Sequence, residues 1–177
     1  GTITYQWFSN NSESTSGGTL ISGATNSSFT PPTTAPGTTQ YYYVEVGSSC
    51  GPDVTSNVSG SFTVNPVTTI QTQPAISSQT GCPGDAFTSI SVSATGPGTL
   101  TYQWFSNSST SNTGGTLFSG AVSSTLTPPS TTTGTTYDYV VVTSTCESVT
   151  SNVSGAFTVN QDTQVNSQNT AAQPICI

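Results

Sequence analysis

The sequence predicts an all-β protein made of tandem β-sandwiches, and three observations support this. Short apolar and polar alternations, rich in Val, Ile, Tyr, Phe and Thr, are bounded by Gly, Pro, Asn and Ser, which is typical of strands. No segment shows helical periodicity. The heptapeptide TYQWFSN occurs at residues 4–10 and again at 101–107, which indicates an internal repeat the size of a small domain.

The repeat sets the predicted domain boundaries. The hexapeptide TSNVSG at 55–60 also recurs, at 150–155, and the strands that end at Asn65 and Asn160 are equivalent. We therefore interpret the chain as a window of a longer array. The predicted domains are residues 1–65, which lack the first strands of a repeat, residues 66–160, a complete repeat, and residues 161–177, the start of a third repeat.

Each predicted strand of the complete repeat is a run of β-branched and aromatic residues closed by turn residues. The strongest run ends at Thr143, and the last predicted strand is expected to break at a bulge near Gly155. Seven strands result, at residues 67–73, 87–94, 99–107, 116–118, 123–127, 136–143 and 149–159.

The order of these strands predicts the kind of sandwich. Seven antiparallel strands, with a tryptophan on the third and a cysteine near the end of the sixth, are the arrangement of an immunoglobulin-like domain. Trp104 shares a strand face with Leu100 and Tyr102, and Trp7 is its equivalent in the first repeat. A tryptophan on a central strand fills the core far more often than it stacks on a sugar, so we predict that Trp7 and Trp104 are core residues.

The composition excludes several function classes. The chain has no Lys, Arg or His, and its seven acidic residues give a net charge of −7. Nucleic acid is excluded as a partner because Lys and Arg bind its phosphates, adsorption to anionic lipid fails for the same reason, and no membrane-inserted segment is recognisable. An enzyme made of this chain would lack His, Lys and Arg, the residues that most often transfer protons or bind anions in active sites.

The acidic residues do not form a paired site. They are scattered singly, and Glu45 and Asp138, on equivalent strands, lie in different repeats. We expect no enzymatic activity, no cofactor and no metal site. Asp162, near a predicted junction, is a lone and weak candidate for calcium binding, which needs clustered oxygen atoms.

Four cysteines remain. Cys82 precedes the second predicted strand and Cys146 follows the sixth, so both are expected near the rim of the sandwich. We predict that they form a disulfide, which stabilises by roughly 4 kcal/mol for a loop of this length; metal binding is disfavoured because no histidine assists. By the same repeat phase, Cys50 and Cys176 are expected to lack partners within this chain. Such a disulfide would place the protein outside the cytoplasm.

Three consecutive tyrosines are the weak candidates for glycan contact. Alternation puts Tyr41 and Tyr43 on one strand face and Tyr42 on the other. Two interpretations stay open: ordinary strand residues that pack inside and outside the sheet, or an exposed aromatic platform on which a sugar ring stacks.

The complete repeat carries an ordered set of motifs: YQWFSN at 102–107, GGTLFSGA at 114–121, TPP at 127–129, GTTY at 134–137, Cys146 and VTSNV at 149–153. This set resembles the immunoglobulin-like repeats of giant surface adhesins from gliding, type IX-secreting bacteria. The resemblance implies a cell-surface or extracellular stalk repeat, a stiff and disulfide-stabilised spacer whose partners are neighbouring repeats, with glycans or other cells bound through other regions. Two alternatives remain, a carbohydrate-binding module of a secreted protein and a subunit of an extracellular filament completed by strands of a neighbouring chain.

Overall fold

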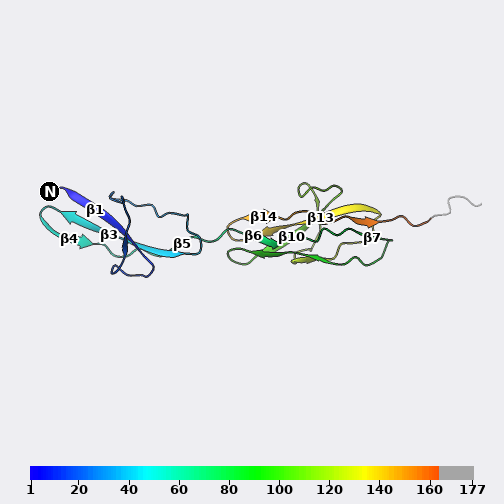
Figure 1. Cartoon of the computed structure of the whole chain (residues 1–177), viewed down its shortest axis with the longest axis horizontal. Helices are drawn as coiled ribbons and strands as arrows, with labels where there is room; N and C mark the ends of the chain where they lie inside the picture. Colours follow the sequence, from blue (N-terminus) through cyan, green and yellow to red (C-terminus); the bar gives the residue numbers. More distant parts are fainter. Residues whose placement is uncertain (164–177) are drawn as a thin grey trace, which may run out of the picture. The chain divides into compact units, whose positions relative to one another are not determined.

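The computed structural model describes residues 1–163, and every regular element in this range is a β-strand. The all-β prediction is confirmed. The chain divides into two compact units, unit 1 at Gly1–Val67 and unit 2 at Thr68–Ile177 (Figure 1). The third repeat expected at 161–177, with Cys176, lies almost wholly outside the described residues, and the predicted domain bounds stay a prediction.

Unit 1 is a sheet built on two long antiparallel strands. β1 (Ile3–Asn10) pairs with β3 (Thr39–Ser48), which places Trp7 opposite Val44. The shorter strands lie at the edges of this pair: β2 (Thr19–Leu20) beside β1, and β4 (Gly51–Thr55) and β5 (Phe62–Thr63) beside opposite ends of β3.

Unit 2 repeats this plan and adds to it. β10 (Thr101–Asn107) pairs with β13 (Gly134–Thr143), which places Trp104 opposite Val140. The other strands of this sheet are β11 (Thr116–Leu117) beside β10, β14 (Ser148–Thr150) and β15 (Phe157–Val159) beside β13, and β7 (Gln79–Gly81) beside β15.

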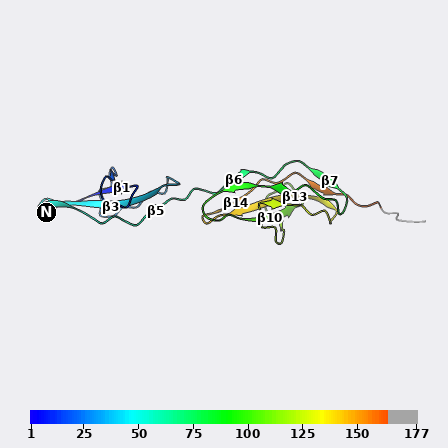
Figure 2. The same ribbon diagram turned by 90° about the horizontal axis from the view of Figure 1, so that it is seen from below.

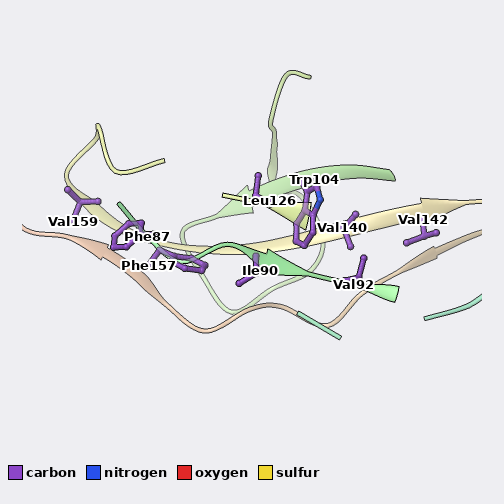
Figure 3. Packing of buried hydrophobic residues seen from close by; sticks show 9 residues of the cluster. All are labelled: Phe87, Ile90, Val92, Trp104, Leu126, Val140, Val142, Phe157 and Val159. Carbon is purple, nitrogen blue, oxygen red and sulfur yellow. The ribbon is translucent and has the colours of Figure 1, made fainter. Parts of the chain in front are cut away.

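A second layer closes the core of unit 2. It consists of β8 (Ile90–Ser91) paired with β12 (Thr125–Leu126), and β9 (Ser93–Thr95) paired with β6 (Thr69–Thr72). Figure 3 shows apolar side chains of the two layers meeting, as two stacked sheets require. The buried cluster contains Phe87, Ile90, Val92, Trp104, Leu126, Val140, Val142, Phe157 and Val159.

Three strands differ from the sequence prediction. The first predicted strand of the complete repeat forms β6 in the second layer. After Pro74 the chain crosses to the other layer, where it forms an additional strand, β7, parallel to β15. The second, predicted at 87–94, is divided into β8 and β9, which pair with different strands. The last predicted strand is interrupted, so that β14 and β15 pair with opposite ends of β13. At the interruption, the backbone N–H of Gly155 donates to the carbonyl of Ala75 at 3.0 Å, where the two crossing segments touch.

Unit 1 has no counterpart of the second layer within the described residues, and its core face is open. Trp104 is 0% exposed and Phe157 1%, whereas Phe62, the equivalent of Phe157, is 43% exposed. Trp7 is only partly buried. The missing contacts are those that Phe87, Ile90 and Val92 make in unit 2. Trp7 therefore lies at the position of a core residue, but no second layer packs fully against its ring.

The chain enters and leaves unit 2 at opposite ends of β13. At the entry, Thr68 donates its backbone N–H to Glu147 Oε1 and its hydroxyl to Ser144 Oγ, both at 2.7 Å. Both acceptor residues lie in the turn of the β13–β14 hairpin. At the exit, the N–H of Asn160 donates to the carbonyl of Gly81 at 2.9 Å. In Figures 1 and 2, β6 and β14 lie toward the entry end of this unit and β7 toward its exit.

Candidate functional site

The polar side chains of the repeated TYQWFSN motif make hydrogen bonds to the backbone of neighbouring loops. Gln103 donates through Nε2 to the carbonyls of Trp104 (3.0 Å) and Phe118 (2.8 Å), which ties β10 to the loop after β11. Trp104 donates through Nε1 to the carbonyl of Ser123 at 2.8 Å. Gln6 and Trp7 make the equivalent bonds in unit 1. The polar atoms of this Gln-Trp pair are thus used by the scaffold in both units.

The asparagine that ends the motif holds the following loop. Asn107 donates through Nδ2 to the carbonyls of Ser111 (3.2 Å) and Thr113 (3.0 Å), and Oδ1 accepts from the backbone of Ser109 at 3.3 Å. Asn10 does the same in unit 1. Asparagine side chains commonly replace backbone partners in turns of this kind.

The repeated Ser-Asn-Val-Ser segment replaces the missing part of the strand ladder. Between β14 and β15, Ser151 Oγ accepts from the N–H of Val140 at 3.0 Å and Ser154 Oγ accepts from the N–H of Asp138 at 2.9 Å. Ser56 and Ser59 serve β3 in the same way. These hydroxyls satisfy backbone donors that would otherwise be buried without a partner.

The tyrosines proposed for glycan contact are largely covered. Tyr42 is 5% exposed and Tyr43 3%, whereas Tyr41 is partly buried. Tyr43 stacks on Phe8 at 5.0 Å between ring centroids, and Tyr42 contacts Phe29 at 5.2 Å. Of the three rings, Tyr41 alone keeps partial exposure. Their role in glycan contact stays a prediction.

One surface hollow recurs at equivalent positions of the two units. Its volume is about 290 Å³ in unit 1 and about 310 Å³ in unit 2. The hollow is uncharged, and its lining side chains carry amide and hydroxyl groups. Its lining is Ser9, Asn10, Asn11, Gly17, Thr19 and Gln40 in unit 1, and Ser106, Asn107, Ser108, Gly114, Gly115, Thr116 and Thr136 in unit 2.

Comparison with known protein families finds a match for the larger part of unit 2. The profile of a family described as a domain of unknown function, DUF8696, matches residues 72–161, just over half of the chain. The chain belongs to the DUF8696 family. A comparison with curated proteins finds no match. The matched DUF8696 range begins at the end of β6 and ends just after β15, so it contains nearly the whole sandwich of unit 2.

The DUF8696 domain carries its two cysteines at opposite ends, and the predicted Cys82–Cys146 disulfide is wrong. Cys82 follows β7, which pairs through β15 with the first residues of β13. Cys146 lies in the hairpin after the last residue of β13. A strand of ten residues is about 30 Å long. Bonded cysteines have Cα atoms within about 7 Å. Both cysteines are exposed and no disulfide joins them; Cys50, also exposed, forms none either.

The DUF8696 domain also buries one acidic residue. Asp138 is 0% exposed on β13, on the face that it shares with Val140 and Val142, and neither carboxylate oxygen has a hydrogen-bond partner. Burial raises the pKa of Asp138 to about 6. The hydroxyl of Ser106, which lies opposite on β10 but is not within hydrogen-bonding geometry of the carboxylate, lowers this pKa by a smaller amount. In unit 1 the same position, opposite Ser9, holds Tyr42.

Side chains that could ligate a metal ion do not cluster in the described part of the chain. Over residues 1–163, no group of three or more His, Cys, Asp or Glu side chains is placed to hold a metal ion. Asp162, the lone calcium candidate, is exposed. No helix in the same range is long and apolar enough to cross a membrane.

Proposed function

We propose that this protein is a non-catalytic structural repeat of an extracellular stalk or surface filament, similar to the repeats of bacterial adhesins, and that it acts as a stiff spacer in cell attachment. The observation that carries this proposal is the separation of entry and exit in unit 2. A domain entered at one end of β13 and left at the other adds its full length to an array.

Short connections favour stiffness. Thr163 follows Asn160 by three positions, as Thr68 follows Asn65. Thr68 is 5% exposed and bonded to the β13–β14 hairpin, so a new unit is anchored from its first residue. Pro66 restricts the backbone of the first connection further. So few unanchored residues leave little freedom between neighbours.

The recurring residues support a scaffold role. The Gln, Trp and Asn of the first motif and both serines of the second make the same hydrogen bonds in the two units. Repetition of these residues is therefore explained by the fold without a ligand. The net charge of −7 would keep neighbouring stalks soluble by mutual repulsion.

The length of an array tests the proposal. The chain would be compared by small-angle scattering with a version to which residues 84–160 are added after Ile177, since Ile177 aligns with Pro83 and the addition completes one more repeat. We expect the maximum dimension to grow by the long axis of one unit. A version that gains little length, because the added unit folds back, would contradict a stiff spacer.

A carbohydrate-binding module is the second candidate, favoured by the polar hollow that recurs in both units. A glycan array probed with the whole chain tests it. Affinity tighter than millimolar that is lost when Thr19→Val and Thr116→Val are combined, which changes the hollow of both units, would support this candidate and would contradict a pure spacer. Thr101→Val, at an exposed strand position outside the hollow, is the control.

A filament subunit is the third candidate, favoured by the open core face of unit 1. An extended segment from a neighbouring chain could supply the second layer, as in other strand-addition assemblies. The neighbouring segment would have to present apolar side chains at alternate positions, as Ile90 and Val92 do in unit 2.

A further inference from the structure

A second hollow of unit 2 lies beside the buried carboxyl group of Asp138. Its volume is about 240 Å³. Among the residues that line it, Pro129 and Thr132 are exposed, whereas Phe157 and Val159 are buried. Figure 3 shows Phe157 and Val159 at one end of the core. The hollow therefore leads from the surface toward this end of the core.

The lining of this hollow combines hydroxyl groups with apolar surface. The residues with hydroxyl groups are Ser106, Thr116, Thr132 and Thr136. The apolar residues are Phe118, Pro129, Phe157 and Val159. A lysine side chain has the same two needs, because its methylene stem packs on apolar surface while its ammonium group donates three hydrogen bonds. Sites for drug-sized ligands measure about 300–1,000 Å³, so this smaller hollow suits a single side chain.

Two residues of the lining are neighbours of Asp138 on one strand face. Ser106 lies opposite Asp138 on β10, and Thr136 precedes it by two positions on β13. Opposite residues of an antiparallel pair have their Cβ atoms about 4.5–5.5 Å apart. A cation held by the Ser106 hydroxyl is therefore a close neighbour of the carboxylate. Asp138 does not itself line the hollow, so it attracts the cation across Ser106 rather than by contact.

Asp138 has no counter-charge among the side chains of its own chain. Neither carboxylate oxygen has a hydrogen-bond partner, and the sequence contains no Lys, Arg or His. A buried charge is costly unless it is paired. A cationic side chain that neutralises Asp138 must therefore come from another molecule, and the net charge of −7 attracts basic partners.

Unit 1 has an equivalent hollow without this charge. Its volume is about 360 Å³, and Ser9 lines it as Ser106 lines the hollow of unit 2. Tyr42, which lies opposite Ser9, takes the place of Asp138. The hollow is thus common to both units, whereas the buried charge beside it is specific to unit 2.

We propose that the hollow beside Asp138 binds the side chain of a lysine from a partner protein. The ammonium group donates to the hydroxyls of Ser106 and Thr136, and the methylene stem packs against Phe118 and Pro129. Lysine fits better than arginine because the carboxylate is not open to the two-pronged contact that a guanidinium group makes, whereas a compact point charge acts through the hydroxyls. The inference goes beyond the spacer role and does not depend on it.

A lysine derivative without free termini, Nα-acetyl-lysine N-methylamide, tests the proposal. It is titrated into the nitrogen-15-labelled whole chain, and the amide shifts are followed by NMR at constant ionic strength. We expect saturable shifts at Ser106, Thr136 and Phe157, and none at Ser9 in unit 1. The norleucine analogue, which lacks the ammonium group, should bind about tenfold or more weakly, because charges about 6 Å apart still interact strongly near a protein surface.

Asp138→Asn is the matched variant, since it keeps the size of the side chain and removes its charge. Binding of the lysine derivative should weaken about tenfold or more. The exposed Glu13→Gln, which changes the net charge equally, should leave binding unchanged. The proposal would be overturned by undiminished binding to Asp138→Asn, by equal binding of the norleucine analogue, or by the same shifts with sodium chloride alone. Tighter binding of the arginine derivative, equal shifts in unit 1, or no shifts up to the solubility limit would overturn it as well.

Discussion

The carbonyl oxygen of Ile76 lies so close to the α-carbon of Gly155 that no side chain fits between them. The segment before β7 crosses the interrupted strand at this point, and Gly155 bonds to Ala75 while Ala156 bonds to Gln79. In unit 1 the equivalent Gly60 has nothing within 4 Å of its β-position, because no crossing segment lies there within the described residues. The two glycines therefore share a sequence context and differ in their surroundings.

Replacing Gly155 by alanine should destabilise unit 2. The added methyl group would contact the backbone of Ile76 and Ser77, which cannot move without breaking the pairing of β7 with β15. We expect a loss of about 1–3 kcal/mol in the free energy of unfolding, as for other overpacked sites. Chemical denaturation followed by the fluorescence of Trp104, in a Trp7→Phe background, measures it.

Gly60→Ala is the matched control for this prediction. Its methyl group meets open space, so the stability of unit 1 should change by less than about 1 kcal/mol. Equal effects of the two substitutions would show that the crossing of β7 over Gly155 does not constrain the fold.

Asp138 should make the stability of unit 2 depend on pH. The pKa of Asp138 is about 6 in the folded protein against an ordinary value of 3.8, so the folded state binds the proton more tightly. Stability is then highest below about pH 4, falls as the pH rises toward about 6, and is level above it. The difference between these two pKa values corresponds to a loss of about 3 kcal/mol in the free energy of unfolding.

Asp138→Asn removes the charge and tests this sign. The variant should be more stable than the wild type at pH 7 and should lose most of the decline between about pH 4 and 6. Thermal unfolding across this pH range provides the measurement, with the exposed Glu13→Gln as control. A wild-type protein that gains stability as the pH rises through this window would contradict a buried, unpartnered carboxyl group.

The strands whose apolar and polar side chains alternate could be predicted from the sequence. The strands that are held in place by backbone contacts alone could not. Alternation found β10 and β13 because their aromatic and β-branched residues face a core. β7 consists of Gln79, Thr80 and Gly81, which carry no apolar signal, and its position depends on the crossing at Gly155. The local pattern around a three-residue strand contains no information about a partner so distant in sequence.

The cysteines show the same limit. The strand order predicts that both cysteines lie in turns at the ends of the sandwich. A sandwich has two ends, however, and the alternation of residues does not say at which end a turn lies. The crossing of the first strand to the other layer puts Cys82 at the exit end. Asp138 is similar: strand alternation places it on one face with Val140 and Val142, but its full burial depends on the second layer of the sandwich, which alternation does not describe.

Ser151→Ala should destabilise unit 2 by leaving a buried donor without a partner. Ser151 is 0% exposed, and its hydroxyl accepts from the N–H of Val140 and donates to the carbonyl of Asn152. The loss should be about 1–3 kcal/mol. Hydrogen exchange of the Val140 amide should accelerate, while the amide of Phe105, in the ladder between β10 and β13, should change only with global stability. Unchanged exchange at Val140 would argue against the hydroxyl as its acceptor.

The open face of unit 1 gives a test of strand completion. A synthetic peptide of residues 79–97 contains β7, β8 and β9, the segment for which unit 1 has no counterpart. If this face accepts a strand, the peptide should shift the emission of the partly buried Trp7 to shorter wavelength and protect it from acrylamide. Trp104 is already 0% exposed and should not respond, which the Trp7→Phe variant checks.

The matched control peptide replaces Ile90 and Val92 by serine and keeps the length and the backbone donors. It should not shift the emission, because these two side chains supply the apolar contacts to Trp104 and Val140 in unit 2. A shift with both peptides would indicate edge pairing without core completion. No shift with either, up to the solubility limit, would contradict the filament candidate and leave the spacer proposal unaffected, since the spacer depends on covalent connection of complete repeats.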